Sequence, residues 1–113
     1  MTIIIVMGKV PPIALSYADD VKEHLRSIDS KHHSLIRSEI EGQLFFEPDV
    51  ETRNRKPLKR PISIGAQWEL RFGPDNRFRV FYLVDADSRQ VHILAVGVKD
   101  GNRLLIGGEE IAS

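Results

Sequence analysis

Between residues 16 and 48, apolar side chains recur every three or four positions, and this spacing predicts two helices. The first is predicted to begin at Ser16, because Asp19 three residues later makes an acidic variant of the capping box. The second is predicted to follow a cap at Asp29 or Ser30 and to stop before Pro48. Almost no chain separates the two helices, so they are predicted to form an antiparallel hairpin. The predicted apolar stripes are Tyr17, Val21, Leu25 and Ile28 in the first helix, and Ile36, Ile40 and Leu44 in the second.

From Ala66 onward the apolar period changes to two, which predicts β-strands. In the first strand Trp68, Leu70 and Phe72 share one face, and the other face carries Gln67, Glu69 and Arg71. A turn at Gly73–Asn76 leads to a strand from about Arg77 to Asp85, and a turn at Ala86–Gln90 leads to another strand at Val91–Val98. That last strand is apolar on both faces, which is typical of a strand in the middle of a sheet.

The remaining segments add an extended start and a polar linker. Ile3–Val6 is β-branched and favours a strand, whereas Pro11-Pro12 breaks any helix there. Asp49–Pro61 is predicted to be a polar linker. The pattern as a whole predicts one α+β domain over residues 1–113, in which Trp68 is largely buried under the helices. The residues expected beside it are Leu25, Ile36 and Ile40.

Two compositional features narrow the possible chemistry. The chain has no cysteine, which excludes disulfides, thiolate catalysis and cysteine–zinc sites, and fits a reducing compartment. The apolar run Ile3–Met7 is far shorter than the roughly 20 residues that a membrane span needs. We therefore expect a cytoplasmic protein without a membrane partner.

Charge is distributed unevenly along a chain whose formal net charge is zero. Residues 1–51 contain 5 Lys and Arg against 9 Asp and Glu, whereas residues 52–113 contain 11 against 7. The net charges are therefore −4 and +4. This asymmetry indicates that the sheet half faces a polyanion.

Arg71 and Arg79 stand out because they fall on the polar face of two neighbouring predicted strands. Arginines that converge from several elements suit phosphate, since each guanidinium can grip two oxygens and stabilise extra charge in a transition state. The alternative is a salt-bridge ladder in which Glu69 and Asp85 pair with the two arginines. The sequence favours neither alternative over the other.

The remaining motifs give weaker indications of a functional site. His32 and His33 are adjacent, so on a helix they diverge by about 100° and are better explained as solvated side chains than as metal ligands. His92 is best explained as a satisfied or edge histidine in its strand. Gly107-Gly108 lacks the lysine of a phosphate loop and predicts a turn before a short C-terminal segment. We expect neither a metal nor a cofactor.

The order of these elements resembles the RelE/ParE superfamily of type II toxin–antitoxin toxins. The resemblance runs from about Ile13 to Arg103 and is carried by the succession Glu-Leu-Arg at 69–71, Phe-Arg-Val-Phe-Tyr at 78–82 and Ile-Leu-Ala-Val-Gly-Val-Lys at 93–99. It implies an N-terminal strand from within Thr2–Leu15 and a helix hairpin, packed on a curved antiparallel sheet. It also implies a cognate antitoxin that covers the sheet or its basic groove.

Members similar to RelE cut messenger RNA in the ribosomal A site without a metal, through attack of the ribose 2′-hydroxyl on the adjacent phosphate. The resemblance implies catalytic roles for Arg71, Arg79 and Lys99. The further residues expected to bind RNA are Lys56, Lys59, Arg60, Arg77 and Arg103. Where RelE has two lysines on the second strand, this chain has Gln67 and Glu69. Where RelE has a late tyrosine, this chain has Leu104-Leu105-Ile106, and its only tyrosines are Tyr17 and Tyr82.

Three functions therefore remain open on the sequence. The chain is a ribosome-dependent messenger RNA endoribonuclease, or a ParE-like toxin that inhibits DNA gyrase by binding, or an attenuated toxin that serves as an antitoxin-binding module. Retained arginines and the basic linker favour the first function, and the absent late tyrosine favours the other two.

Overall fold

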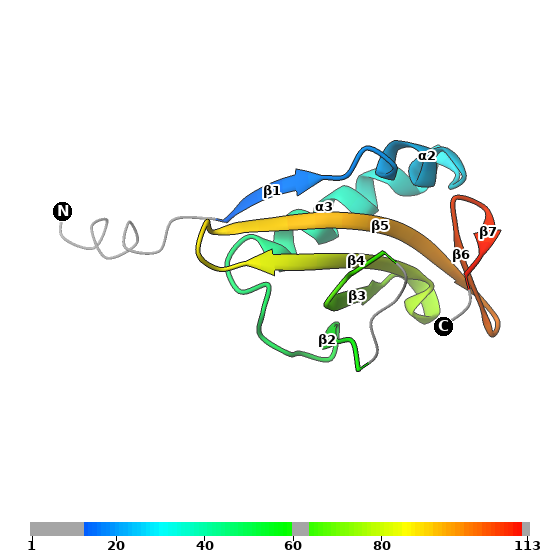
Figure 1. Ribbon diagram of the computed structural model, residues 1–113. Helices are drawn as coiled ribbons and strands as arrows, with labels where there is room; N and C mark the ends of the chain where they lie inside the picture. The colour runs from blue at the N-terminus through cyan, green and yellow to red at the C-terminus, as the bar shows by residue number, and fades with distance from the viewer. Residues whose placement is uncertain (1–12, 60–63, 112–113) are drawn as a thin grey trace.

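In a computed structural model, which describes residues 13–59 and 64–111, the chain folds into a mixed sheet with helices on one side (Figure 1). The helical elements are α2 (Val21–Arg26), the 3₁₀ turn η1 (Ser30–His32), α3 (His33–Leu44) and the 3₁₀ turn η2 (Pro74–Asn76). The strands are β1 (Ala14–Tyr17), β2 (Arg55–Pro57), β3 (Trp68–Phe72), β4 (Phe78–Asp85), β5 (Gln90–Asp100), β6 (Arg103–Ile106) and β7 (Glu109–Glu110).

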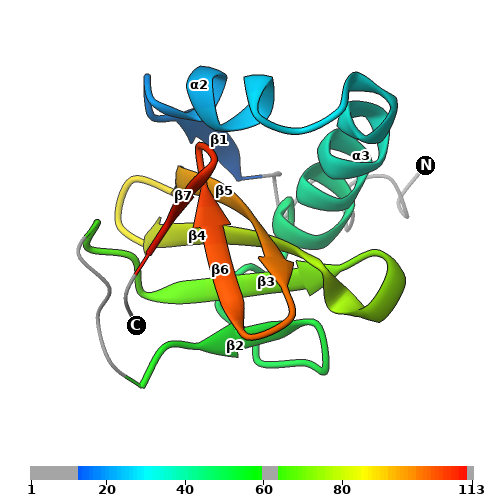
Figure 2. The same ribbon diagram turned by 90° about the vertical axis from the view of Figure 1, so that its right-hand side faces the viewer.

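The sheet is antiparallel in the order β2-β3-β4-β5-β6-β7, and β1 adds to β5 in parallel. The long strand β5 lies at the centre: β4 borders one edge, while β1 and then β6 follow the other edge in turn. Figure 2 shows α2 and α3 together on one side of this curved sheet. Among the described residues, no helix is long and apolar enough to cross a membrane.

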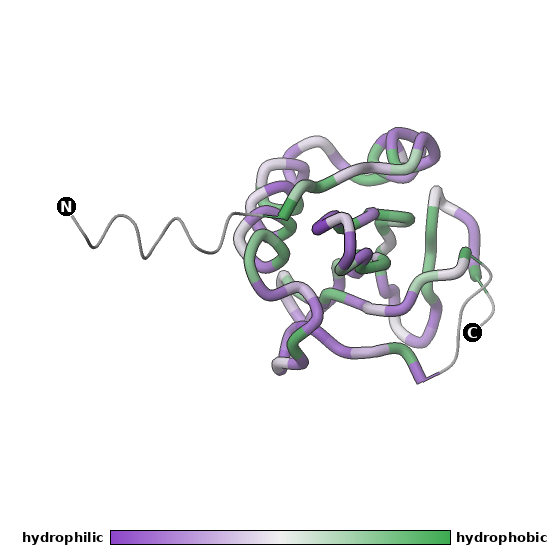
Figure 3. The backbone as a smooth tube through the Cα atoms, turned by 60° about the vertical axis from the view of Figure 1, so that its left-hand side comes forward, coloured by the Kyte–Doolittle hydropathy of each residue, from purple (hydrophilic) through white to green (hydrophobic). Residues whose placement is uncertain are grey.

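The alternation predicted for the strands places apolar side chains on the face beneath the helices. Figure 3 shows how hydrophobic and hydrophilic residues follow one another along the backbone. Leu70, Val80, Tyr82 and Ile93 are fully buried there. They pack with Ile36, Ile40 and Leu44, so the stripe predicted for the second helix is confirmed. A smaller apolar cluster on the opposite face consists of Ala66, Phe81, Ala95 and Ile106.

The prediction that a helix begins at Ser16 is wrong. Residues 14–17 instead form β1, whose register pairs Ser16 with His92 and Tyr17 with Ile93. Pairing with a central strand satisfies the backbone of this segment along its whole length, which outweighs a local capping signal. Helix α2 begins only at Val21, with Asp20 as its N-cap.

Other boundaries also shift. The predicted linker contains β2, and Leu104–Ile106 lies in β6.

Trp68 is only partly buried, not largely buried as predicted; it packs at the margin of the core and stacks on Tyr82 with ring centroids 6.2 Å apart. The extended segment predicted at Ile3–Val6 lies outside the described residues.

Candidate functional site

The sheet face opposite the helices gathers cations from four neighbouring strands. Register places Lys56 of β2 opposite Glu69 of β3, and Arg71 of β3 opposite Arg79 of β4. Arg79 in turn pairs with Gly97 of β5, so Lys99, two residues further on, lies diagonally from it on the same face. We call this set of Lys56, Lys59, Glu69, Arg71, Arg79 and Lys99 the cationic face.

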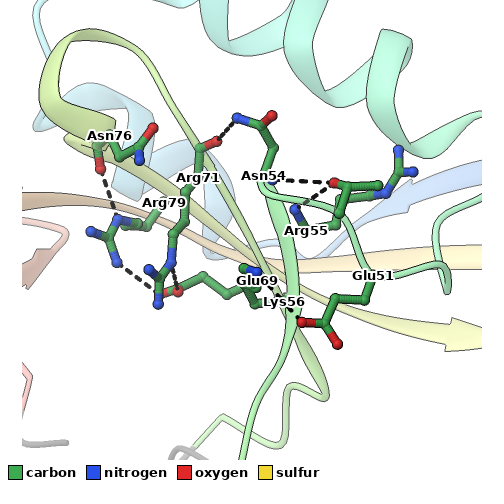
Figure 4. A network of polar contacts seen from close by, with 9 residues as sticks. Glu51, Asn54, Arg55, Lys56, Glu69, Arg71, Asn76 and Arg79 are labelled. Atoms are coloured by element: carbon green, nitrogen blue, oxygen red, sulfur yellow. Dashed lines mark hydrogen bonds and ion pairs between the residues drawn. The ribbon is translucent and has the colours of Figure 1, made fainter.

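Glu69 joins the two arginines of the cationic face (Figure 4). Its carboxylate accepts from Arg71 Nε at 2.5 Å and from Arg79 NH1 at 3.3 Å. The Glu69 side chain is 8% exposed, and those of Arg79 and Arg71 are 13% and 40% exposed. Arg71 therefore presents the accessible guanidinium of the pair, and Arg79 lies beneath the surface with Glu69.

Further hydrogen bonds hold the side chain of Arg79 and the backbone of Arg71. Arg79 Nε donates to the Asn76 carbonyl at 2.8 Å. Arg71 exchanges bonds with Asn54 of the segment before β2: Arg71 N donates to Asn54 O at 2.8 Å, and Asn54 Nδ2 donates to Arg71 O at 2.9 Å. Both guanidiniums are thus held by the Glu69 carboxylate. The Asn76 carbonyl also holds that of Arg79, whereas the Asn54 bonds hold the backbone of Arg71.

Lys56 and Lys59 border a groove of about 520 Å³ beside the arginine pair. The groove is lined by Glu51, Lys56, Pro57, Leu58, Lys59, Glu69 and Arg71. Lys56 Nζ lies 3.4 Å from the Glu51 carboxylate, and Lys59 is exposed. The groove therefore offers an accessible guanidinium and two ammonium groups to an anionic ligand.

The structure does not bring every candidate cation to the cationic face. Arg77 lies with its guanidinium over the Phe78 ring, 5.3 Å from the centroid, in a pocket that also includes Ser27 and Asp29. Arg103 pairs with Asp100 at 3.1 Å. Its neighbour Leu104 packs in the apolar cluster on the cationic side, so strand alternation places Arg103 on the opposite side. Arg60 lies outside the described residues.

The two explanations of the arginines, a phosphate site and a salt-bridge ladder, each agree with part of the structure. Glu69 does pair with both, as a salt-bridge ladder requires, but Asp85 does not join them. Hydrogen bonds from the Ser88 side chain and then from the Ser88 backbone lower the pKa of Asp85. Arg71 remains accessible despite its partner. The pairing thus neutralises part of the positive charge and leaves the face open.

Neither tyrosine lies on the cationic face. Tyr82 belongs to the core beneath the helices, where its hydroxyl donates to the Pro48 carbonyl at 2.6 Å and burial raises its pKa far above the ordinary value. Tyr17 lines an apolar groove with Leu25, Ile36 and Ile40, and burial followed by the charge of Glu41 raises its pKa. Neither phenol is placed to exchange a proton with a ligand at Arg71.

Sequence reasoning missed the role of Arg55, which belongs to the basic linker but is buried. Its Nε donates to Val50 O at 3.0 Å and its NH1 donates to Gln43 O at 2.7 Å, so it ties β2 to the end of α3. Only its position in a short strand separates it from the exposed lysines nearby, and that strand was not predicted.

The histidines have structural partners. His33 Nε2 lies 2.8 Å from both Leu25 O and Ile28 O, so it is not the solvated side chain that was predicted, and it closes the end of α2. His32 packs against Phe78, and His92 Nδ1 lies 2.7 Å from Ser16 Oγ, which agrees with a satisfied histidine. Among residues 13–59 and 64–111, no group of three or more His, Cys, Asp or Glu could hold a metal ion.

Comparison with known proteins establishes the fold. No family model and no curated protein matches the chain in sequence. A chain of the toxin–antitoxin complex RelBE2 from Mycobacterium tuberculosis matches in structure, with a TM-score of 0.63 and 23% sequence identity. The match covers 78% of this chain and 99% of that chain. The predicted fold class, a RelE-like α+β fold with helices on a curved antiparallel sheet, is therefore confirmed.

Proposed function

We propose that this chain is the toxin of a type II toxin–antitoxin pair and that its cationic face is the site of a metal-independent messenger RNA endoribonuclease. The observation that supports this most directly is the pair Arg71 and Arg79, braced by Glu69 on the open face of a RelE-like sheet. Two fixed guanidiniums beside a groove bordered by lysines suit the phosphate backbone of single-stranded RNA.

In the proposed reaction the ribose 2′-hydroxyl attacks the adjacent phosphorus. A new P–O2′ bond forms, the P–O5′ bond breaks, and the products carry a 2′,3′-cyclic phosphate and a 5′-hydroxyl. Arg71 contacts the phosphate oxygens directly, because its guanidinium is the accessible one. Arg79 supports the same charge from below, and Lys99 adds an ammonium from the neighbouring strand.

Glu69 is the acidic partner that the sequence has in place of a family lysine. Both of its oxygens accept from guanidinium groups, so we assign it the role of bracing the arginines and not that of transferring protons. The proton of the attacking hydroxyl then passes to water or to a group of the ribosome, and the departing 5′ oxygen takes a proton from water or from such a group. In this proposal the chain contributes electrostatic stabilisation and orientation, which account for a large share of catalysis in many enzymes.

The proposed partner is a cognate antitoxin, because the structural neighbour is a chain of a toxin–antitoxin complex. We propose that both act in the cytoplasm, where ribosomes and messenger RNA are found. Expression of this chain alone should arrest growth, and co-expression of the antitoxin encoded beside it should restore growth. Normal growth at high expression, with no neighbour-encoded protein that binds, would contradict the toxin assignment.

The nuclease is tested by mapping 5′ ends on messenger RNA in translating ribosomes. Wild type should give codon-phased cuts, and Arg71→Ala or Arg79→Ala should slow them by about 10²–10³-fold, as loss of one transition-state donor does elsewhere. Arg79→Lys should recover only part of the rate, because an ammonium keeps the charge but loses the fork. Arg37→Ala is the matched control, since Arg37 is exposed and paired with Glu41 on the helix side.

A second function is supported by the absence of any tyrosine from the cationic face and by the partial neutralisation of its arginines. Both features favour binding without chemistry, either as a ParE-like inhibitor of DNA gyrase or as an antitoxin-binding module. Cells that filament while supercoiling stalls, with no cuts in messenger RNA, would support gyrase inhibition. The absence of both effects, with antitoxin binding retained, would support the module.

A further inference from the structure

The turn between β3 and β4 is built from unusual backbone conformations. Asp75 and Asn76 both lie in the left-handed region, with φ of 55° and 52°, which Asp and Asn adopt more readily than other residues that carry a Cβ. Gly73 precedes them with φ of 81°, and a Cβ there would lie 2.6 Å from Cδ2 of the Phe78 ring. These conformations are typical of tight turns that join two strands.

The carbonyls of this turn divide into two groups. Those of Gly73 and Pro74 accept from Asn76 N and Arg77 N within the turn, each at 3.0 Å. Those of Asn76 and Arg77 accept from outside it: Asn76 O from Arg79 Nε at 2.8 Å, and Arg77 O from Lys99 N at 2.7 Å. One outward bond thus comes from the guanidinium of Arg79 and the other from the backbone of Lys99, and both residues belong to the proposed site.

We propose that the left-handed conformation of Asn76 positions the Arg79 guanidinium for a phosphate ligand. Asn76 is a positioning residue that acts through its carbonyl, and the proposal rests on the proposed function in taking the cationic face as a phosphate site. The carbonyl engages the single hydrogen of Arg79 Nε, while Glu69 engages NH1 (Figure 4). A guanidinium is planar, so bonds at two of its nitrogens fix its plane and leave the remaining N–H groups for the ligand.

The residue after Asn76 is bonded to β5. The bond from Lys99 N to Arg77 O holds the backbone of β5 against the start of β4, two residues before Arg79. The ladder between β4 and β5 continues from this bond and pairs Arg79 with Gly97.

The first test compares two substitutions that remove the same side chain. Glycine adopts a left-handed conformation freely, whereas valine, which is β-branched, strongly disfavours it. Proton exchange at Arg79 Nε, followed by ¹⁵N NMR, should be slow in wild type and in Asn76→Gly and fast in Asn76→Val. Should Asn76→Val not fold, Asn76→Ala replaces it. Equal protection in all variants would overturn the proposal.

The second test titrates inorganic phosphate against the Nε signals of Arg71 and Arg79. Asn76→Val should weaken phosphate binding by about tenfold, at the low end of what outer partners of ligating side chains contribute. Asn76→Gly should stay within about twofold of wild type. The control is Arg89→Val: Arg89 has φ of 54° in the turn at the other end of β4, so its replacement should lower stability and leave Arg79 Nε protected.

The outcomes separate this proposal from the proposed function. Phosphate binding that depends on the conformation of residue 76, with no cuts in messenger RNA, supports the positioning role and counts against the nuclease. Codon-phased cuts whose rate is the same in Asn76→Gly and Asn76→Val support the nuclease and overturn the positioning role.

Discussion

The two faces of the sheet use alternate residues of the same strands for opposite purposes. Beneath the helices, Leu70 and Val80 are fully buried in an apolar core. On the other side, their chain neighbours Glu69, Arg71 and Arg79 form a charged cluster with graded exposure. Successive residues of β3 or β4 therefore alternate between the apolar core and the proposed ligand site.

The difference shows how a rigid site is obtained from flexible side chains. Arginines on a solvated strand face ordinarily sample many rotamers, and exposed ion pairs contribute little to stability. Here a nearly buried carboxylate restricts both guanidiniums, and the Asn76 carbonyl further restricts that of Arg79. The core face fixes the strands, and the bonds from Glu69 and Asn76 fix the guanidinium groups relative to those strands.

The largest expected effect is on the core face. Leu70→Ala should lower the free energy of unfolding by about 2–5 kcal/mol, because it leaves a cavity in a fully buried cluster. Arg71→Ala, one residue away and 40% exposed, should change stability by less than about 1 kcal/mol. Urea unfolding followed by Trp68 fluorescence measures both. Similar losses for the two variants would contradict the division between the faces.

A smaller loss is expected at Glu69. Glu69→Ala should cost about 1–3 kcal/mol, because it leaves the mostly buried Arg79 guanidinium without its carboxylate. Glu69→Gln should cost less, since an amide oxygen still accepts one hydrogen bond. Cleavage should fall in both variants as the arginines lose their common anchor. Faster cleavage in Glu69→Gln, with the fold intact, would show that Glu69 restrains the site by neutralising it.

The hydroxyl of Tyr82 should matter to stability and not to chemistry. Tyr82→Phe removes the buried bond to Pro48 O and leaves that carbonyl unpaired, at a cost of about 1–2 kcal/mol. Cleavage, measured on messenger RNA well below the melting temperature, should remain at the wild-type rate. A loss of cleavage in a folded variant would mean that this core tyrosine takes part in the reaction.

Much of the core face was predictable, because period and burial go together. The alternation from Trp68 to Phe72 and the stripe of Ile36, Ile40 and Leu44 each follow from a single local rule. The first helix was misplaced because its segment satisfies its backbone against β5, which lies about 75 residues further along the chain. No local pattern reports a partner at that distance.

The cationic face was predictable only in outline. Strand alternation placed Arg71 and Arg79 on one face, but the choice between carboxylate and phosphate partners depends on geometry that spacing does not contain. The exclusion of Arg77 and the burial of Arg55 follow from positions at strand ends, where boundary predictions are weakest. The left-handed Asn76 leaves no signal beyond the turn composition itself.

The smallest expected effect is a pH dependence confined to the helix side. Between the end of β1 and the start of β6, the edge of β5 has no strand partner at Val96 within residues 13–59 and 64–111. The Val96 N–H donates instead to His24 Nδ1 of α2 at 3.3 Å. Burial lowers the pKa of His24, and the nearby Asp20 opposes this only in part. The folded state therefore favours the neutral imidazole, which is the form that can accept the bond.

The sign follows from linkage. Since the pKa of His24 is lower in the folded chain, its contribution to stability is present above about pH 6.5 and is lost as pH falls through the folded value. The loss should be about 0.5–1 kcal/mol, which is the worth of one hydrogen bond. His24→Gln should reduce the slope of the free energy of unfolding against pH between pH 7 and pH 5, as measured by urea unfolding. Parallel slopes for wild type and His24→Gln would show that α2 docks on β5 without this bond.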